Sequence, residues 1–464
     1  MKPIPLLLAL CFCCGCSQQG RLIGTPAAEL LQGSDIQVVF NHRRGGRYRS
    51  PLTGTWRDGD DLEQFLIDAI DAAEQSLQLA VQELTLPRIA LALIRARQRG
   101  VSVQIVLENN YSAPWSRQQV SHLQKHQRQR WQRLNRLADR NGDGVTTAEE
   151  AHQGDAIALL QDAGIPLLDD TADGSRGSGL MHHKFLIVDQ KTVITGSANF
   201  TSSGIHGDAG AASTRGNVNH LLRINSAQLA RIFREEFDQL WGDGPGGIED
   251  SRFGRSKSSR DVQSATVGEH TIEVLFAPHS KNNPVHGLQW ISQQLSRARQ
   301  RIDMALFVFS AQQLANTLQE KAKEAIQIRL LADSGFASRS YSEVLDLLGV
   351  ALPDRDCKLE RGNQPFAKPL RGVGTPRLTR GDKLHHKFAV IDHKTVITGS
   401  FNWSPSAAHT NDETLLVIHS PQLAQHFTRE MDRLWDTAEL GITPHIQRKL
   451  DRQKIRCGDG VERD

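Results

Sequence analysis

The chain contains 464 residues, of which 39% are hydrophobic and 23% are charged. These are ordinary values for globular proteins, so they argue against a disordered chain, and the length allows two or three domains. The net charge of +3 with His neutral argues against a surface built to coat nucleic acid. A local basic cleft is still compatible with this average.

The first residues have the pattern of an export signal. Lys2 precedes an apolar run over 4–12, which ends in a patch of small residues at 13–16. The run is too short to span a bilayer as a permanent helix. It resembles a bacterial lipoprotein signal in which residues 1–15 are removed and Cys16 carries the lipid. An ordinary secretory signal is the alternative. The resemblance, with serine after the cysteine, implies an exported protein that is lipid-anchored, at the outer membrane, through Cys16.

The segment from 62 to 109 alternates helix-like and strand-like patterns. Apolar residues at helical spacing over 65–73 precede a strand-like run at 77–81, and a second helical stretch at 89–99 precedes an apolar strand at 101–107. Strands that alternate with helices predict an α/β layer in which the sheet is buried between helices.

A helical insertion at 113–165 interrupts this alternation and contains a calcium-loop motif at 139–150. The loop has oxygen-bearing side chains at positions 1, 3 and 5, Gly144 at position 6, a backbone carbonyl at position 7 and Glu at position 12, which matches the EF-hand pattern. Helical patterns flank it on both sides, at 130–138 and 148–163. The expected Ca²⁺ ligands are Asp139, Asn141, Asp143, Val145, Thr147 and Glu150. A glycine-bent helical hairpin that binds no metal is the alternative, because such loops usually work in pairs.

Two adjacent strands are predicted at 184–189 and 192–195, with polar residues at their ends. Side chains two residues apart share a face of a strand, so His182 and Lys184 point the same way. A Gly-Ser pair ends the second strand, and Asn199 follows at the turn. Lysine offers a positive charge, the asparagine amide donates to a phosphate oxygen, and histidine supplies a nucleophile or a proton. The motif therefore predicts a phosphate site.

The whole segment 182–199 returns at 385–402 without a gap, and this copy adds His385, Lys387 and Asn402. A lone His-x-Lys on a strand is usually a solvated edge. A histidine cluster can bind a metal, but lysine would then lie beside the cation. Neither alternative explains why the full spacing recurs, so we interpret both copies as parts of one catalytic site.

The aspartate of each copy is expected to be structural. Asp189 lies an odd number of residues from Lys184, which places it on the opposite face of a regular strand, and a carboxylate would repel a phosphate. We therefore assign Asp189 and Asp392 either to pairing with a nearby base or to capping backbone amides.

The repeat divides the chain into two lobes. The predicted ranges are 35–241 for lobe 1, 242–268 for a linker rich in Gly and Ser, 269–443 for lobe 2 and 444–464 for a basic tail. Cys357 and Cys457 can form a disulfide in an oxidising compartment, although two cysteines do not make a framework.

The duplicated pattern His-x-Lys-x4-Asp-x6-Gly-Ser-x-Asn resembles the phospholipase D superfamily. The resemblance covers nearly the whole mature chain apart from the insertion, the linker and the tail. It implies an α/β fold of two α/β/α sandwich lobes related by a pseudo-two-fold axis, with the active site at their interface. The chain would then be a monomer that acts as an internal pseudo-dimer.

The resemblance also implies double displacement through a phosphohistidine. His182 would attack phosphorus, and His385 would protonate the leaving oxygen and then activate water. No catalytic metal is expected, because the lysines supply the positive charge. The residues implied to hold the phosphate oxygens are Lys184, Lys387, Asn199 and Asn402.

A carboxylate after the second motif completes the implied set. Glu413 follows His385 and is expected to orient its imidazole. The aligned residue in the first copy is Asn219, an amide that would orient His182, and Asp208 is considered as a substitute acid there.

The expected substrate is a phospholipid at a membrane surface, whose head-group phosphodiester bond is hydrolysed. The alternative is an endonuclease of the same superfamily that cleaves DNA or RNA. Basic segments at 43–49, 252–260 and 448–456 favour the nuclease slightly, but we interpret the last two as solvated linker and tail. A third class, a calcium-responsive binding protein with degenerate motifs, is disfavoured because both motifs are intact.

Overall fold

The computed structural model describes residues 30–175, 179–208, 213–458 and 462–463. The predicted signal at 1–15 and the predicted lipid attachment site Cys16 lie outside the described residues. The chain from residue 32 onward forms one compact unit, and the fold below is that of this unit.

A seven-stranded mixed sheet forms the centre of lobe 1. Its strands, in spatial order, are β1 (Ile36–Phe40), β9 (His220–Asn225), β8 (Thr192–Gly196), β7 (Lys184–Val188), β4 (Ser76–Val81), β5 (Ser102–Leu107) and β6 (Leu167–Asp169). The strands β4, β5 and β6 are parallel, and β7, β8, β9 and β1 continue the sheet in antiparallel pairs.

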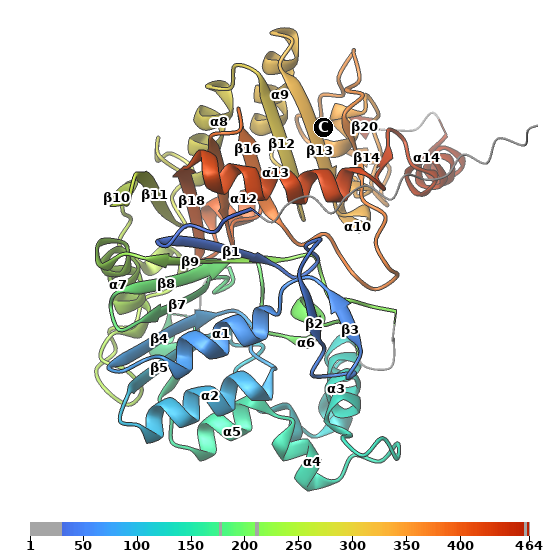
Figure 1. Cartoon of the computed structure of the whole chain (residues 1–464). Coiled ribbons are helices and arrows are strands. Elements are labelled where there is room, and N and C mark those ends of the chain that lie inside the picture. Colours follow the sequence, from blue (N-terminus) through green and yellow to red (C-terminus); the bar gives the residue numbers. More distant parts are fainter. Residues whose placement is uncertain (1–29, 176–178, 209–212, 459–461, 464) are drawn as a thin grey trace, which may run out of the picture. The chain divides into compact units, whose positions relative to one another are not determined.

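Helices cover both faces of this sheet (Figure 1). The outer face packs against α1 (Leu62–Asp71), α2 (Pro87–Gln98) and α5 (Ala156–Asp162). The inner face packs against α7 (Ala227–Trp241). Neighbouring strand residues point to opposite faces, so Leu79 joins the outer core and Ala80 the inner one. The predicted burial of the sheet between helices is confirmed.

Lobe 2 repeats this plan around a nine-stranded sheet. In spatial order the strands are β10 (Gln263–Val267), β11 (His270–Ala277), β18 (Glu413–His419), β17 (Thr395–Gly399), β16 (Lys387–Ile391), β12 (Arg301–Leu306), β13 (Gln327–Ala332), β15 (Val373–Thr375) and β19 (Glu439–Leu440). The outer helices are α8 (Gly287–Ser296), α9 (Gln312–Lys323), α11 (Glu343–Leu347) and α12 (Pro405–His409). The inner helix is α13 (Pro421–Trp435).

The inner faces of the two sheets share one apolar core with α7 and α13. Phe185 of lobe 1 packs edge-on against Phe233, with 5.2 Å between the ring centroids. Its repeat counterpart Phe388 packs against Phe427, with 5.0 Å between the ring centroids. Each buried phenylalanine contributes about 1.5–3 kcal/mol relative to an exposed one. The two-lobed α/β fold expected from the repeat is therefore confirmed.

The insertion is a helical hairpin, but it ends earlier than predicted. It contains α3 (Lys125–Ala138), the calcium-loop segment and α4 (Ala148–Gln153). The predicted helix at 148–163 is broken at Gly154, where Asp155 caps the start of α5 with its side chain. Because Ile157 and Leu160 of α5 pack into the core of lobe 1, the segment from 155 to 165 belongs to the lobe.

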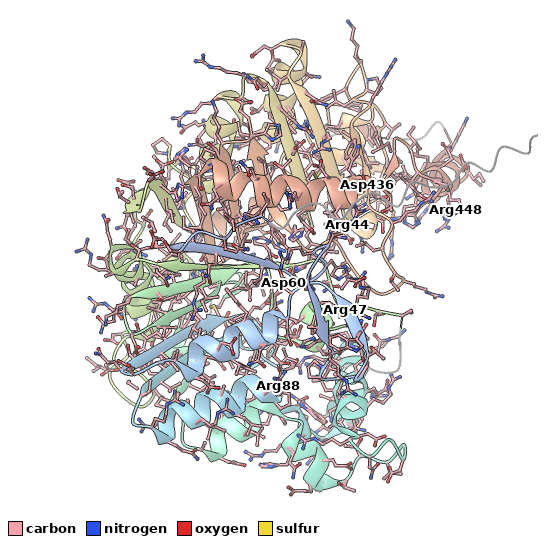
Figure 2. The ribbon with its side chains drawn as sticks, in the orientation of Figure 1. Arg44, Arg47, Asp60, Arg88, Asp436 and Arg448 are labelled. Atoms are coloured by element: carbon pink, nitrogen blue, oxygen red, sulfur yellow. A yellow bond between two sulfur atoms is a disulfide. The ribbon has the colours of Figure 1, made fainter. Side chains whose placement is uncertain are left out.

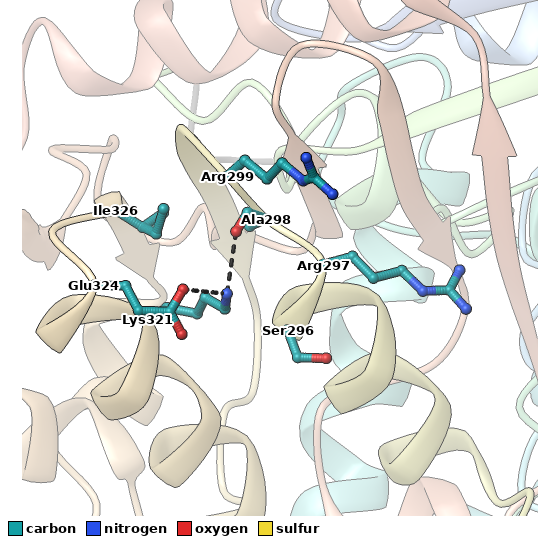
Figure 3. Close-up of a pocket in the computed structure, with 7 residues that line it drawn as sticks. All are labelled: Ser296, Arg297, Ala298, Arg299, Lys321, Glu324 and Ile326. Atoms are coloured by element: carbon teal, nitrogen blue, oxygen red, sulfur yellow. Dashed lines mark hydrogen bonds and ion pairs between the residues drawn. The ribbon is translucent and has the colours of Figure 1, made fainter.

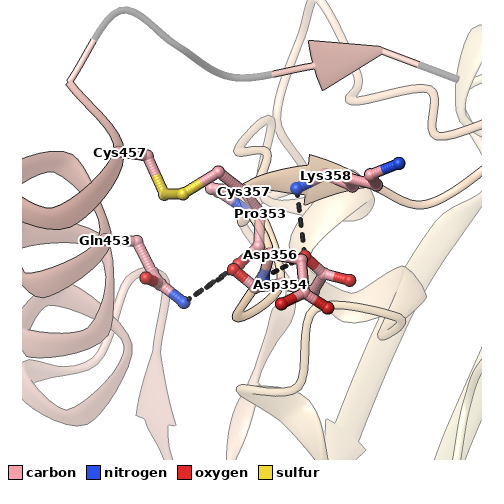
Figure 4. Close-up of a disulfide and its surroundings, with 7 residues drawn as sticks. All are labelled: Pro353, Asp354, Asp356, Cys357, Lys358, Gln453 and Cys457. Atoms are coloured by element: carbon pink, nitrogen blue, oxygen red, sulfur yellow. Dashed lines mark hydrogen bonds between the residues drawn. A yellow bond between two sulfur atoms is a disulfide. The ribbon is translucent and has the colours of Figure 1, made fainter.

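The predicted linker and tail both contain regular structure. The linker supplies β10, an edge strand of the lobe 2 sheet. The tail forms α14 (Pro444–Cys457), and a disulfide joins Cys457 to Cys357 with 5.6 Å between their Cα atoms (Figure 4). Two short strands, β14 (Lys358–Leu359) and β20 (Glu462–Arg463), pair with each other, and each follows one of the two cysteines in the sequence. Both segments are interpreted from the sequence as solvated, and the linker lacks a clear apolar period.

The first basic segment forms a hairpin of β2 (Arg47–Arg49) and β3 (Trp56–Asp58). Arg44 reaches Asp436 at 2.8 Å, just beyond the end of α13, and Figure 2 shows the two side chains close together.

The remaining short elements are η1 (Trp115–Arg117), η2 (Val120–His122), η3 (Ala172–Gly174), α6 (Ser202–Ile205), η4 (Gly254–Ser256) and α10 (Ser334–Ala337). Across the described ranges, no helix combines the length and the apolar character needed to cross a bilayer.

Candidate active site

Both histidine motifs lie at the start of a central strand and are tied to the opposite lobe through the backbone. The backbone amide of His182, just before β7, donates to the carbonyl of Asp412 at 2.9 Å. The amide of His385, just before β16, donates to the carbonyl of Val218 at 3.1 Å. These contacts bring together the two half-sites that the repeat predicted.

The residues that orient the imidazoles cross between the lobes, which corrects the expected pairing. The carboxylate of Glu413 lies 2.8 Å from Nδ1 of His182, not beside His385. The Asn219 side-chain oxygen lies 3.0 Å from Nδ1 of His385 instead. The exchange follows from topology, because Asp412 pairs across the interface and Glu413 directly follows it. Asp208, considered as a substitute acid, lies beside Thr214.

The Glu413 carboxylate is buried and held from two sides. Ser400 donates its hydroxyl to the same oxygen that contacts His182, at 2.5 Å. Burial raises the pKa of Glu413 to about 7, although the nearby Lys184 opposes this rise. Asn219 is held in the same manner in the other lobe, because Ser197 donates to its side-chain oxygen at 2.8 Å.

The two lysines are almost completely buried. Lys184 Nζ donates to the carbonyl of His182 at 2.8 Å, and Lys387 Nζ donates to that of His385 at 2.7 Å. Burial lowers the pKa of Lys184 to about 7 and lowers that of Lys387 well below its usual value. For Lys387 the charge of Lys184 adds to the effect of burial, so the two ammonium groups act on a common space.

The histidines share this electrostatic environment. Burial lowers the pKa of both His182 and His385 well below 6.5, and both lysines lower it further. Four groups that can carry positive charge therefore face one another with one carboxylate among them. Burial and mutual repulsion disfavour their charged forms, so a bound anion such as a phosphodiester would raise these pKa values and favour protonation of the lysines and histidines.

Two residues that the sequence analysis missed distinguish the half-sites. In lobe 1, the Gln82 side-chain oxygen lies 3.4 Å from Lys184 Nζ and 3.2 Å from Asn199 Nδ2. In lobe 2 the corresponding position after the strand is Phe307, whose ring lies 4.6 Å from that of His385 and 4.9 Å from Lys387 Nζ. Each residue follows a parallel central strand, where loop residues often contribute to sites.

The two asparagines occupy matching positions after β8 and β17. Their side-chain oxygens, Oδ1 of Asn199 and of Asn402, are buried and have no hydrogen-bond partner in the described structure. Buried polar atoms are usually paired, so each of these oxygens has the capacity to accept a hydrogen bond from a bound ligand or water.

The motif aspartates lie at the opposite end of the strands from the histidines. Asp189 accepts hydrogen bonds from the backbone amides of residues 74, 75 and 76, just before β4. Asp392 accepts from those of residues 299, 300 and 301, just before β12. This geometry corresponds to the amide-capping role considered for them, and it keeps both carboxylates away from the phosphate site.

A buried lysine from the linker joins the two lobes behind the site. Lys257 Nζ pairs with Asp412 at 2.7 Å and also with Glu236, which in turn contacts His183 at 3.1 Å. Burial alone would lower the pKa of Lys257, but the two carboxylates raise it overall. The interpretation of 252–260 as solvated linker is therefore wrong at Lys257 and Arg260, which both pair with the buried Glu236. The other two cations of the segment, Arg252 and Arg255, are exposed.

The calcium-loop segment is exposed and turns at a glycine with positive φ. Gly144 has a φ of +84°, a conformation that favours glycine at loop position 6. Asp139 accepts from the amides of Gly142 and Gly144 at 2.9 Å each. Glu150 contacts the amide of Thr147 at 3.0 Å, which lowers the pKa of its carboxyl.

The hollow drawn in Figure 3 is not part of this site. It is lined by residues around the end of α8, where Lys321 donates to the carbonyl of Ala298 at 3.1 Å. The amide of Arg299 in its wall donates to Asp392. It therefore lies at the Asp392 end of β16, away from His385 and Lys387.

A family model described as "Cardiolipin synthase, PLD-like domain" matches residues 66–241 and 291–435. Each match covers one lobe and includes one His-x-Lys motif, so each lobe supplies half of the site.

Known proteins resemble the chain over a part of its length. A "Mitochondrial cardiolipin hydrolase" of Mus musculus is 26% identical over 161 residues, which is 34% of this chain and 61% of the relative. A "Phospholipase D" of Rickettsia typhi is 25% identical over 161 residues, 35% of this chain and 66% of the relative. The chain thus spans less than two thirds of each of these relatives.

A solved structure resembles the fold of both lobes together. The phosphatidylserine synthase of Haemophilus influenzae Rd KW20 superposes with a TM-score of 0.55 over 92% of this chain and 94% of that one, at 12% identity.

Proposed function

Because this chain belongs to the family described as cardiolipin synthase, PLD-like domain, we propose that it is a phosphodiesterase that hydrolyses the head-group phosphodiester bond of phospholipids. The observation that carries the proposal is the crossed pairing of the catalytic histidines, each held at Nδ1 by an acceptor from the other lobe. The relatives described as cardiolipin hydrolase and phospholipase D support a lipid substrate.

The reaction proceeds in two displacements. Nε2 of His182 attacks phosphorus, so a P–N bond forms while the bond to the leaving oxygen breaks, and His385 gives that oxygen a proton. Water then attacks phosphorus, His385 takes its proton, and the P–N bond breaks. The lysines and asparagines of both motifs hold the phosphate oxygens as charge shifts.

The assignment of His182 as the nucleophile rests on its partner. Phosphorylation puts positive charge on the imidazole, and the Glu413 carboxylate 2.8 Å from Nδ1 stabilises that charge. His385 has the neutral oxygen of Asn219 instead, together with the carbonyl of Ser197 at 3.1 Å. A neutral partner leaves its imidazole free to lose and regain a proton.

The test combines products with a chemical trap. The purified chain is incubated with labelled phosphatidylcholine, cardiolipin or single-stranded DNA, each with calcium and with a chelator. Phosphatidic acid or its equivalent is the expected product. Denaturation at alkaline pH, where the P–N bond of a phosphohistidine survives, should leave the phosphorus label on the peptide that contains His182. Cleavage of DNA alone would show a nuclease instead, and label on the peptide with His385 would reverse the two roles.

Variants provide the control for this test. We expect His182→Asn and His385→Asn to abolish turnover. The same change at His122, an exposed residue of the insertion, should leave turnover intact. Equal activity in all three variants would overturn the proposed site.

We also propose that the loop at 139–150 binds Ca²⁺. Six oxygen donors in EF-hand order are the hard ligands that this ion prefers, and the positive φ of Gly144 supports the fit. The ion would fix the end of α3, whose Arg130 pairs with Glu83 at 2.8 Å, next to Gln82. Its role would be structural or regulatory, since the loop is separate from the catalytic histidines.

The proposed location is the bacterial outer membrane, with the mature chain exported and anchored through Cys16. The disulfide between Cys357 and Cys457 supports export, because disulfides persist in oxidising compartments. Mass spectrometry of the membrane fraction, compared with a Cys16→Ser variant, tests the lipid attachment. A soluble, unmodified wild-type chain would contradict it.

A further inference from the structure

The helix α14 carries a cationic sector beside its buried side. Ile446 is buried and Leu450 half-buried against lobe 2, which sets the inward direction of the helix. At about 100° per residue, a neighbouring sector of the same helix collects most of its cations. The members of this sector are His445, Arg448, Lys449, Arg452, Ile455 and Arg456, and Figure 2 labels Arg448.

A surface hollow of about 300 Å³ lies between this sector and two loops of lobe 2. Its charged lining residues are Arg339, Arg355, Lys449, Arg452, Arg456 and Asp354. The carboxylate of Asp354 already accepts backbone amides from Asp356 and Lys358, at 2.8 and 3.0 Å (Figure 4). None of the four arginines pairs with a carboxylate among the described side chains.

The cations of the hollow repel one another. Burial lowers the pKa of Lys449, and the charges of Arg339 and Arg452 lower it further. Lys257 and Arg260 have buried carboxylate partners. In the hollow, five cations face one lining carboxylate, Asp354, whose pKa is lowered by backbone hydrogen bonds and in part by Arg456, so positive charge is in excess. A surface of this kind attracts anions.

The hollow borders the second half-site through a short series of contacts. Lys449 Nζ donates to the carbonyl of Ser338 at 2.7 Å, and the next residue, Arg339, lies over the ring of Phe336 at 5.8 Å. That ring is 4.5 Å from Phe307, which itself lies against His385. The hollow is therefore connected to the catalytic residues of lobe 2 through Arg339, Phe336 and Phe307.

An exposed apolar side chain indicates which anionic surface fits. Ile455 is 87% exposed, the highest value among the large hydrophobic side chains of the described residues. Water disfavours this exposure, and a phosphate backbone would give the side chain no apolar contact. A bilayer interface offers both anionic head groups and an apolar phase.

We propose that α14, with the loops at 338–340 and 353–355, is a docking surface for a bilayer of anionic phospholipids, which presents the substrate to the active site. The inference rests on the proposed function for the identity of the substrate. Binding itself requires only the cations and Ile455, so the two can fail separately.

The experiment measures binding and catalysis apart, in a Cys16→Ser background that removes the predicted lipid. Sedimentation with vesicles of phosphatidylcholine, alone or mixed with phosphatidylglycerol, gives the affinity. Hydrolysis of a short-chain, water-soluble phosphatidylcholine gives catalysis without a surface. We expect preference for the mixed vesicles, weakened by salt.

Three variants locate the surface. The double change Arg452→Gln/Arg456→Gln should weaken binding to mixed vesicles about tenfold or more, since each cation near an anionic surface adds to the attraction. Ile455→Ser should also weaken it. The matched control is Lys454→Gln, an exposed lysine on the other flank of α14, which should change binding less than twofold. Soluble-substrate turnover should be unchanged in all three.

The outcomes separate the two proposals. Wild-type vesicle binding by the double variant, or equal losses in the control, overturns the docking surface. Binding to single-stranded DNA is measured in parallel. If the double variant loses binding to DNA but not to vesicles, the surface belongs to nucleic acid, which also overturns the proposal. If vesicles bind through α14 but no lipid is hydrolysed, the docking surface stands and the proposed function fails.

Discussion

At the scale of single residues, the two half-sites differ in the charge behind the imidazole. Glu413 and Asn219 both reach across the interface, but one offers a carboxylate and the other an amide. Since the repeat makes the surroundings similar, this difference is the main chemical asymmetry between His182 and His385. It should therefore control which histidine acts as the nucleophile.

Replacing Glu413 by Gln tests this asymmetry. The variant retains the size of the side chain but removes the charge that stabilises a phosphorylated His182. We expect kcat to fall roughly 10²- to 10⁴-fold, the range of a positioned catalytic group, with a smaller change in KM. Steady-state kinetics on phosphatidylcholine provide the measurement, and an unchanged kcat would contradict the role.

The opposite change, Asn219→Asp, adds a carboxylate behind His385. The pKa of His385 is held well below 6.5 by burial and by Lys387 and Lys184. A negative charge favours the imidazolium, so its pKa should rise and the acid catalyst should stay protonated to higher pH. The alkaline limb of the kcat profile should therefore move to higher pH, and a shift to lower pH would disprove this electrostatic account.

At the scale of elements, the linker is part of the interface. Lys257→Met leaves Glu236 and Asp412 buried without the cation that lies between them. Removing one partner of a buried pair typically costs about 3–5 kcal/mol, so the free energy of unfolding should fall by about this amount in urea titrations. Lys281→Met changes an exposed lysine and is the control. Equal stability of the two variants would show that Lys257 does not join the lobes.

The loop between α3 and α4 allows a separate prediction. Glu150→Gln removes the expected bidentate ligand, so the affinity for Ca²⁺ should fall roughly tenfold or more in calorimetric titrations. The adjacent Glu149→Gln makes the same charge change outside the ligand positions and should leave the affinity nearly unchanged. Turnover should persist in the Glu150 variant. If it is lost as completely as in His182→Asn, the ion belongs to the chemistry.

At the scale of the whole molecule, buried histidines in the shared core should limit stability in acid. His220 and His386 lie 2.9 Å apart at Nδ1, and burial lowers the pKa of both below 6.5. Below about pH 6.5 these histidines bind protons in the unfolded chain but stay neutral in the native state. The free energy of unfolding therefore decreases as the pH falls. The second copy has Thr414 at this position, where it contacts His183 at 2.9 Å.

The variant His220→Thr would copy that arrangement into the first half of the repeat. It removes one of the two histidines, so the loss of Tm between about pH 7.5 and about pH 5.5 should be smaller than in the wild type. Differential scanning calorimetry at both values measures the difference. The same loss in both proteins would show that other groups dominate the acid response.

The sequence alone was sufficient to predict the two lobes, the alternating layers and the pairing of two motifs in one site. This was possible because the signals are local: apolar periods mark strands and helices, and the return of 182–199 as 385–402 without a gap marks a duplication. The motif aspartates could also be separated from the chemistry by strand alternation, and the structure places them at the far strand ends.

Only the tertiary structure decided which groups lie behind the histidines, because those contacts join residues 231 and 166 positions apart. Gln82 and Phe307 likewise carry no signal of function until the fold places them beside the lysines. The burial of Lys257 depends on carboxylates from both lobes, so its linker sequence reads as solvated. Local periodicity determines which elements form, but packing across the interface determines which side chains meet.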